Sequence, residues 1–153
     1  AETQVNAPSS DIWEQASARF LDPEAQLRWE ISLAWVLRTA PQEKETYPLP
    51  DYAIGRRFVQ SLDKLQGVAR TKVLDVIVDV LTKRDKDLSG RRLHRLRTGS
   101  PGGAPARQRG DGAQACRVAI QRGTPAARQL HYWKLPSGKI ELDQVGVHDQ
   151  GLA

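Results

Sequence analysis

The chain of 153 residues has 39% hydrophobic residues, one cysteine and a formal net charge of +5. This length and apolar content fit one globular domain with a modest core. A single thiol excludes an internal disulfide and a site made of several cysteines. The first residues show no apolar run of signal-peptide type, and no apolar run approaches the ~20 residues that cross a bilayer. We therefore expect a cytoplasmic protein without a membrane segment.

The charge is divided unevenly along the chain. Residues 1–50 carry four cationic side chains against eight acidic ones, whereas residues 51–153 carry nineteen against ten. A positive field of this size attracts phosphate backbones, although many basic proteins bind no nucleic acid. We expect an acidic helical extension over 1–50 and a basic domain over 51–153.

Two helices are predicted in the acidic part. In "SSDIWEQASARFL", Ile12, Trp13, Ala16 and Phe20 recur at helical spacing. "DPEAQLRWEISLAWVLRTAP" offers Asp22 as N-cap and Pro23 at the first helical position. Its apolar stripe consists of Leu27, Ile31, Ala34 and Trp35, and Pro41 ends the element. This aromatic, acidic segment completes the core, forms a dimer surface, or lies across the basic sheet as a partner site.

A helical pair follows a proline-rich stretch. "QEKETYPLPDYA" has no apolar period and is predicted to be a linker. Two antiparallel helices joined at Gly67 are expected next. Their apolar positions are Phe58, Leu62 and Leu65 in the first helix and Val73, Val76, Ile77, Val80 and Leu81 in the second.

The C-terminal part has the pattern of strands. "LHRLR" is a short strand, residues 98–112 form a flexible basic loop, and three antiparallel strands follow in "AQACRVAIQ", "AARQLHYW" and "KIELDQVGVHD". In the last strand the apolar residues change from even to odd positions, which predicts a β-bulge near Asp143 and Gln144. Helices followed by strands indicate an α+β fold with helices on one sheet face and the other face exposed.

Residues 52–149 resemble the RelE/ParE superfamily of toxins from bacterial toxin–antitoxin systems. The resemblance lies in the helical pair, "LSGRRLHRLR", the strand arginines of "CRVAI" and "ARQLHYW", and the final "VGVHD". It implies a helical hairpin packed on a small twisted antiparallel sheet whose concave basic face holds messenger RNA on the ribosome. It also implies cleavage by 2′-hydroxyl attack without metal or cofactor, and an antitoxin as partner. The long loop at 98–112 and residues 1–50 depart from the family pattern.

The resemblance implies catalytic roles for five residues. Arg117 would position the backbone, Arg128 would stabilise phosphate charge and His148 would transfer protons. His131 has the family spacing from Arg128, whereas strict alternation selects Tyr132, which would stack on a base. The expected RNA-binding residues are Arg91, Arg92, Arg95, Arg97, Arg107, Arg109 and Lys134.

Other interpretations remain open for the same residues. The arginines could be solvated surface charges, and the aromatic residues could be ordinary sheet packing. His94, His131 and His148 lack the close spacing of zinc motifs, and "TGSPGG" lacks the lysine of a nucleotide-binding loop. The alternative functions are a non-catalytic inhibitor, such as a gyrase poison, and a nucleoprotein subunit. Convergence of Arg117, Arg128 and His148 on one phosphate would favour the nuclease, and separation would favour binding.

Overall fold

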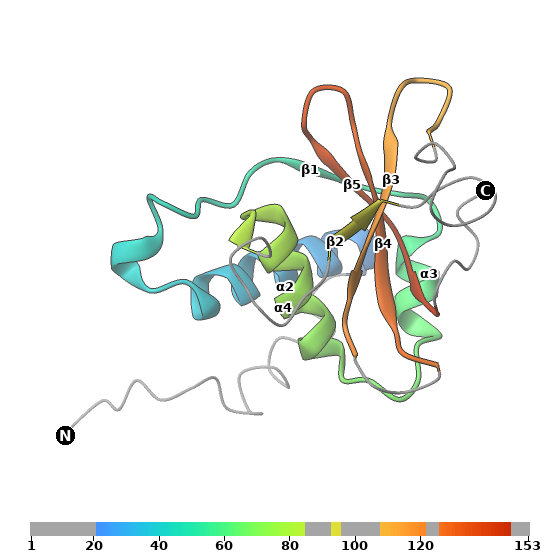
Figure 1. Cartoon of the computed structure of the whole chain (residues 1–153). Helices are drawn as coiled ribbons and strands as arrows, with labels where there is room; N and C mark the ends of the chain where they lie inside the picture. The colour runs from blue at the N-terminus through green and yellow to red at the C-terminus, as the bar shows by residue number, and fades with distance from the viewer. Residues whose placement is uncertain (1–20, 85–92, 96–107, 122–125, 148–153) are drawn as a thin grey trace.

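The structure, a computed structural model, describes residues 21–84, 93–95, 108–121 and 126–147, and of 93–95 it describes the backbone alone. The elements in chain order are the helix α2 (Pro23–Arg38), the short 3-10 helix η1 (Pro41–Glu43), the strand β1 (Tyr52–Ile54), the helices α3 (Phe58–Asp63) and α4 (Arg70–Leu81), and the strands β2 (Leu93–Arg95), β3 (Gln114–Ala119), β4 (Gln129–Lys134) and β5 (Ile140–Gly146). Figure 1 shows the helices grouped beside the sheet. The α+β prediction is confirmed at this level.

The helix α2 begins as its sequence predicts. The carboxylate of Asp22 accepts a hydrogen bond from the backbone N–H of Ala25 at 3.1 Å, and Pro23 occupies the first turn. Leu27, Ile31 and Ala34 are buried in the same core cluster as the sheet residues. The interpretation that this segment completes the core is therefore confirmed for α2. The helix predicted over residues 10–20 lies outside the described residues.

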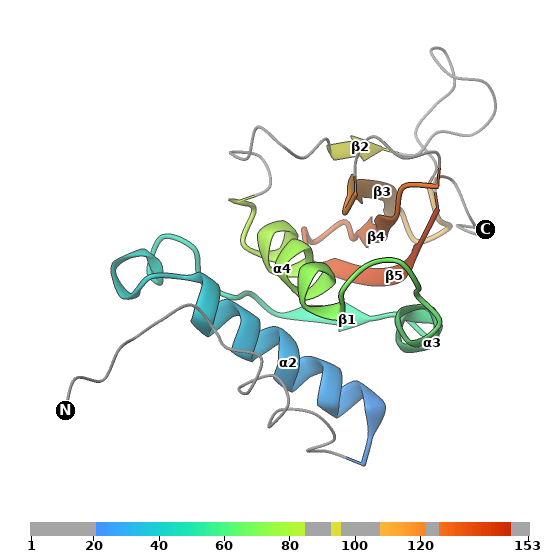
Figure 2. The ribbon, with the colours of Figure 1, turned by 90° about the horizontal axis from the view of Figure 1, so that it is seen from below.

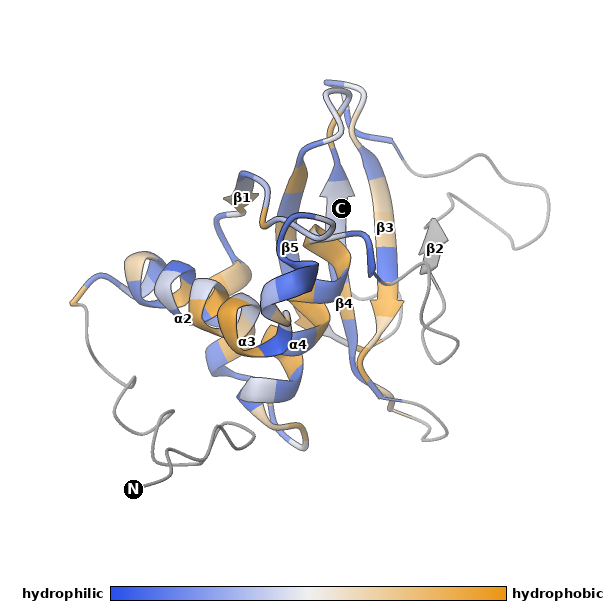
Figure 3. Cartoon of the chain, turned by 90° about the vertical axis from the view of Figure 1, so that its left-hand side faces the viewer, coloured by the Kyte–Doolittle hydropathy of each residue, from blue (hydrophilic) through white to orange (hydrophobic). Residues whose placement is uncertain are grey.

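The helix α4 forms the centre of the molecule. It lies between the sheet and α2 (Figure 2), so side chains on almost all of its faces are buried. They include Val73, Leu74, Val76, Ile77, Val78, Val80 and Leu81. Since β-branched residues have modest helix propensity, packing on two sides stabilises this helix. Figure 3 shows the apolar residues gathered where the helices meet the sheet.

The sheet is mixed, with the order β1-β5-β4-β3-β2. β1 pairs in parallel with β5, and the other neighbours are antiparallel. Two expectations were therefore wrong: residues 42–53 are not wholly a linker, and the sheet is not wholly antiparallel. A strand of three residues is too short to show a period of two, and its partner lies at the far end of the chain.

The predicted bulge in β5 is confirmed. His131 pairs with Gln144 and Tyr132 pairs with Leu142, so Asp143 is the extra residue between them. Leu142 and Val145 have even and odd numbers and would lie on opposite faces of a regular strand. With the extra residue between them, both lie in the same apolar core. It also places Gln144 directly across from His131, on the sheet face opposite the helices.

The two faces of the sheet differ in composition. Cys116, Val118, Leu130 and Tyr132 belong to the core that the helices cover. On the opposite face, Trp133 packs with Ala113, Ala115 and Leu135, and His131 has no exposed surface. The expectation of an exposed second face is wrong at these positions, because the face carries a small apolar cluster of its own.

Within the described ranges, no helix has the length and apolar character needed to span a membrane.

Candidate nucleic-acid interface

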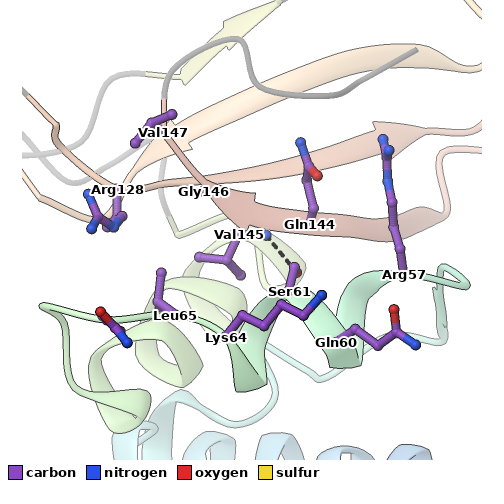
Figure 4. A pocket seen from close by; sticks show the side chains of 11 residues that line it. Arg57, Gln60, Ser61, Lys64, Leu65, Arg128, Gln144, Val145, Gly146 and Val147 are labelled. Carbon is purple, nitrogen blue, oxygen red and sulfur yellow. Dashed lines mark hydrogen bonds between the residues drawn. The ribbon is translucent and has the colours of Figure 1, made fainter.

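An open cleft of about 450 Å³ lies between α3 and the edge of β5. Its cations are Arg57, Lys64 and Arg128, and none of the described residues that line it carries a carboxylate. The other lining residues are Gln60, Ser61, Leu65, Gln66, Gln144, Val145, Gly146 and Val147. Figure 4 shows Lys64 and Gln60 on the α3 side, Arg128 near Gly146, and Gln144 rising from β5 away from α3.

The cleft exists because α3 and β1 share the outer edge of β5. β1 pairs with Ile140–Leu142 of β5 and with no later residue of that strand. Beyond Leu142, α3 lies along the strand, with Phe58 and Leu62 buried toward the core. The opposite surface of α3 therefore carries Gln60 and Lys64, which are exposed to solvent.

Two hydrogen bonds attach the segment that contains α3 to the strand β5. The Ser61 hydroxyl accepts a hydrogen bond from the backbone N–H of Val145 at 3.0 Å and donates one to the carbonyl of Phe58 at 2.8 Å. The backbone N–H of Gly55 donates to the carbonyl of Leu142 at 2.7 Å. A Cβ at Gly55 would lie 2.6 Å from that carbonyl oxygen, so the approach requires glycine. Residues 55–61 are therefore attached to β5 at both ends of this segment.

The cations of the cleft differ in how they are paired. Arg57 makes a bidentate ion pair with Asp143, the bulge residue, with contacts of 2.8 and 3.3 Å. Lys64 and Arg128 have no carboxylate partner in the part of the chain that the structure describes. Arg128 instead donates to the carbonyl of Ala126, and its guanidinium lies near Gly67 in the turn between the helices. Lys64 and Arg128 thus carry positive charge that no acidic side chain of the described residues neutralises.

The two strand arginines lie on opposite sides of the sheet. Arg117 pairs in register with His131, on the face away from the helices. Arg128 lines the cleft beside α3 and approaches Gly67, on the helix side. The structure therefore brings Arg128 together with Lys64 but does not bring it together with Arg117.

The remaining predicted catalytic residues have three different positions. Tyr132 is 3% exposed and belongs to the core under the helices, so its expected stacking on a base is wrong. His131 is fully buried, which keeps its imidazole away from any ligand in solution. His148 lies outside the described residues, directly after Val147 in the sequence.

The expected RNA-binding cations are dispersed. Arg91, Arg92, Arg97 and Arg107 lie outside the described residues, and only the backbone of Arg95 is described, in β2. Lys134 is exposed and lines a second, smaller hollow of about 280 Å³. This hollow lies at the hairpin tips, which are the turn before β3 (residues 109–113) and the turn between β4 and β5 (residues 135–139).

Arg109 is engaged by protein groups. It pairs with Asp111 and Glu141, and it lies over the ring of Trp133 at 5.0 Å. The two carboxylates raise the pKa of Arg109, and the hydrogen bond from Arg109 in turn lowers the pKa of Asp111 to about 2. Arg109 is therefore a structural cation of the hairpin tips more than a ligand for phosphate.

Sequence reasoning missed Arg57, Lys64 and Gln144 as cleft residues. The signal for Lys64 was its place on the polar side of a helix whose inner side holds Phe58 and Leu62. No sequence signal placed that polar side against the far end of the chain. Among the described residues, no three side chains of His, Cys, Asp or Glu are grouped so that they could hold a metal ion.

Comparison with known proteins finds no matching family model, no matching curated protein and no matching solved structure.

Proposed function

We propose that this chain binds single-stranded RNA, with the sugar–phosphate backbone in the cleft between α3 and β5. The observation that carries the proposal is the pair Lys64 and Arg128, which line one cleft and lack acidic partners in the described structure. Cations of this kind neutralise phosphates and release their counterions. Leu65 and Val147 add apolar surface for sugars and bases. The positive charge of residues 51–153 supports the same partner.

The proposal extends to RNA cleavage of the RelE type in the cytoplasm, on ribosome-bound messenger RNA, with an antitoxin as the controlling partner. In this reaction the ribose 2′-hydroxyl gives its proton to a base and its oxygen attacks the neighbouring phosphorus. The bond to the 5′-oxygen breaks, that oxygen takes up a proton, and a 2′,3′-cyclic phosphate remains. Arg128 would stabilise the phosphate charge. The described lining of the cleft contains no histidine or carboxylate, so proton transfer is assigned to His148, which follows Val147 in the chain.

A non-catalytic nucleic-acid-binding module is the second candidate. The separation of Arg117 and Arg128 on opposite sheet faces favours it, because a phosphate in the cleft would contact one of these arginines and not both. Binding through Lys64 and Arg128 is common to both candidates. The experiments below therefore test binding first and chemistry second.

Binding is tested with a labelled single-stranded RNA titrated with the full chain at several salt concentrations. Lys64→Gln and Arg128→Gln should each weaken binding and lower the slope of log affinity against log salt by about 0.7, the value for one lost phosphate contact. Lys139→Gln is the charge-matched control, because Lys139 pairs with Asp51 outside the cleft. Equal slopes for all four proteins would refute the proposed cleft.

Cleavage is tested by expressing the chain, His148→Ala and Arg128→Ala, and following growth and messenger-RNA integrity. The nuclease predicts cut transcripts with the parent chain and intact transcripts with both variants. RNA binding with intact transcripts in the parent would instead establish the non-catalytic module.

A further inference from the structure

Gln144 has an unusual position at the upper rim of the cleft. It follows the bulge residue Asp143, and the bulge turns it to the sheet face opposite the helices, across from His131. It also lines the cleft that contains Lys64 and Arg128. Figure 4 shows its amide rising from β5 next to the upright side chain of Arg57. The residue therefore connects the basic cleft with the upper face of the sheet.

The amide of Gln144 is nearly enclosed yet unsatisfied. The residue is 9% exposed, and its side-chain nitrogen is buried without a hydrogen-bond partner. The amide oxygen receives no hydrogen bond from the described residues either, but unlike the nitrogen it keeps contact with solvent. Buried amide groups in folded proteins are almost always hydrogen-bonded, because leaving them unpaired is unfavourable. An apolar side chain would fill this position with no such penalty.

We propose that Gln144 recognises the edge of an RNA base whose phosphates are held by Lys64 and Arg128. This inference rests on the proposed RNA-binding function. A primary amide presents one donor and one acceptor in a plane, and adenine offers the complementary pair through its N6 amino group and N7. The cations contact phosphates, which are the same in every RNA sequence, whereas the amide contacts a base and can discriminate between bases. Gln144 is thus the specificity-determining residue of the cleft, and adenine is the preferred base.

The bulge explains why the amide can act in this way. Without the extra residue Asp143, position 144 would lie on the helix side of the sheet, since side chains alternate along a strand. The ion pair between Asp143 and Arg57 holds the bulge at the rim. The bulge therefore presents the amide at the cleft while Val145 returns to the core.

The test uses the full chain and homopolymeric oligoribonucleotides of adenine, cytosine and uracil of equal length. We expect the parent to bind the adenine oligomer about tenfold more tightly than the others, within the range for one base contact. Gln144→Met keeps the length of the side chain and removes the amide. It should abolish the preference while the salt dependence stays unchanged. Gln42→Met is the matched control and should keep the preference, because Gln42 is exposed in η1 and does not line the cleft.

Thermal unfolding separates a binding role from a structural one. Gln144→Met should unfold at the same temperature as the parent or higher, since it removes an unpaired buried group. A marked fall in the unfolding temperature would assign the amide a structural role and overturn the inference. A parent with no base preference, or a Gln144→Met variant that retains it, would also overturn the inference while leaving RNA binding intact. A parent that binds none of the oligomers would overturn the proposed function itself.

Discussion

The α2–α4 interface and the α3–β5 cleft both contain arginine or lysine. The cations of the interface are paired with carboxylates, whereas two of the three cations of the cleft are not. At the interface, Arg38 donates two hydrogen bonds to the carboxylate of Asp79, at 2.8 and 2.9 Å. Arg70 donates two to the carboxylate of Glu30, at 2.8 and 3.0 Å. These pairs raise the pKa of both arginines, mainly through the hydrogen bonds. In the cleft, Lys64 and Arg128 have no such partner among the described residues.

This difference separates charges that stabilise the fold from charges that are available to a ligand. A buried carboxylate such as Asp79 needs its arginine, because desolvation would otherwise disfavour the charged form. An exposed lysine such as Lys64 is solvated and contributes little to folding. The comparison predicts that variants in the two regions will affect stability and RNA affinity in inverse order.

The largest effect is expected for Arg38→Met. The variant keeps the apolar stem of the side chain but removes both hydrogen bonds to Asp79, which is fully buried. The free energy of unfolding should fall by about 3 kcal/mol. Chemical denaturation with an unchanged denaturant dependence would measure this loss.

A second variant shows whether the loss comes from the buried charge. Arg38→Met combined with Asp79→Leu replaces the pair by apolar groups and should recover much of the stability. If the double variant is less stable than Arg38→Met alone, the pair is not the cause and the proposed contrast between the regions weakens.

Gly55→Ala tests the close contact between Gly55 and the backbone of β5 at Leu142. The new Cβ would collide with the carbonyl oxygen of Leu142, so β1 or α3 must move away from β5. We expect a loss of about 2–3 kcal/mol, as for overpacked sites. Gly110→Ala is the control, because a Cβ there meets nothing within 4 Å. Equal stability of the two variants would show that the close approach of Gly55 is not required.

Arg70→Gln and Lys64→Gln test most directly whether stability and RNA affinity depend on different regions. Arg70→Gln leaves the nearly buried carboxylate of Glu30 without its cation, so it should lower stability by about 2 kcal/mol. Lys64→Gln should change stability by less than about 0.5 kcal/mol but weaken RNA binding. Denaturation and RNA titration on both proteins check the pattern. A stable Arg70→Gln protein with weakened RNA binding would reverse the assignment of the two regions.

Local signals in the sequence were sufficient for the start of α2 and for the bulge in β5. Asp22 and Pro23 determine where α2 begins, because one caps the free N–H groups and the other lacks an N–H to be satisfied. The change of apolar parity along β5 located the bulge at Asp143, since two core residues of opposite parity require an extra residue between them. Both are properties of a few consecutive residues.

The cleft depends on contacts between distant segments, which local patterns do not report. Arg128 was predicted as a phosphate ligand and does line the cleft, but Arg57 and Lys64 flank α3, far earlier in the chain. The parallel pairing of β1 with β5 leaves room for α3 beside Val145, and three residues of β1 carry no periodic signal. Tyr132 was misassigned because alternation gives the face of a residue but not which face the helices cover.

The smallest effect is expected at the hairpin tips, where charges are matched as at the α2–α4 interface but exposed as in the cleft. Arg109 and a backbone N–H from Ala113 hold the pKa of Asp111 at about 2, below its ordinary value of 3.8. Because the folded pKa is depressed, this carboxylate stabilises the fold above pH 3.8, and the contribution is lost as the pH falls toward 2.

Nuclear magnetic resonance titration of the Asp111 carboxyl measures the shift. We expect a midpoint near 2 in the parent and a higher one in Arg109→Gln, still below 3.8 because the hydrogen bond from Ala113 remains. High salt should move the parent midpoint in the same direction, since exposed pairs are screened. A parent midpoint near 3.8 would mean that Arg109 is not engaged by Asp111. Glu141 would then be the remaining acidic partner of Arg109 among the described residues, and Arg109 would be closer to Lys64 and Arg128 in its availability to phosphate.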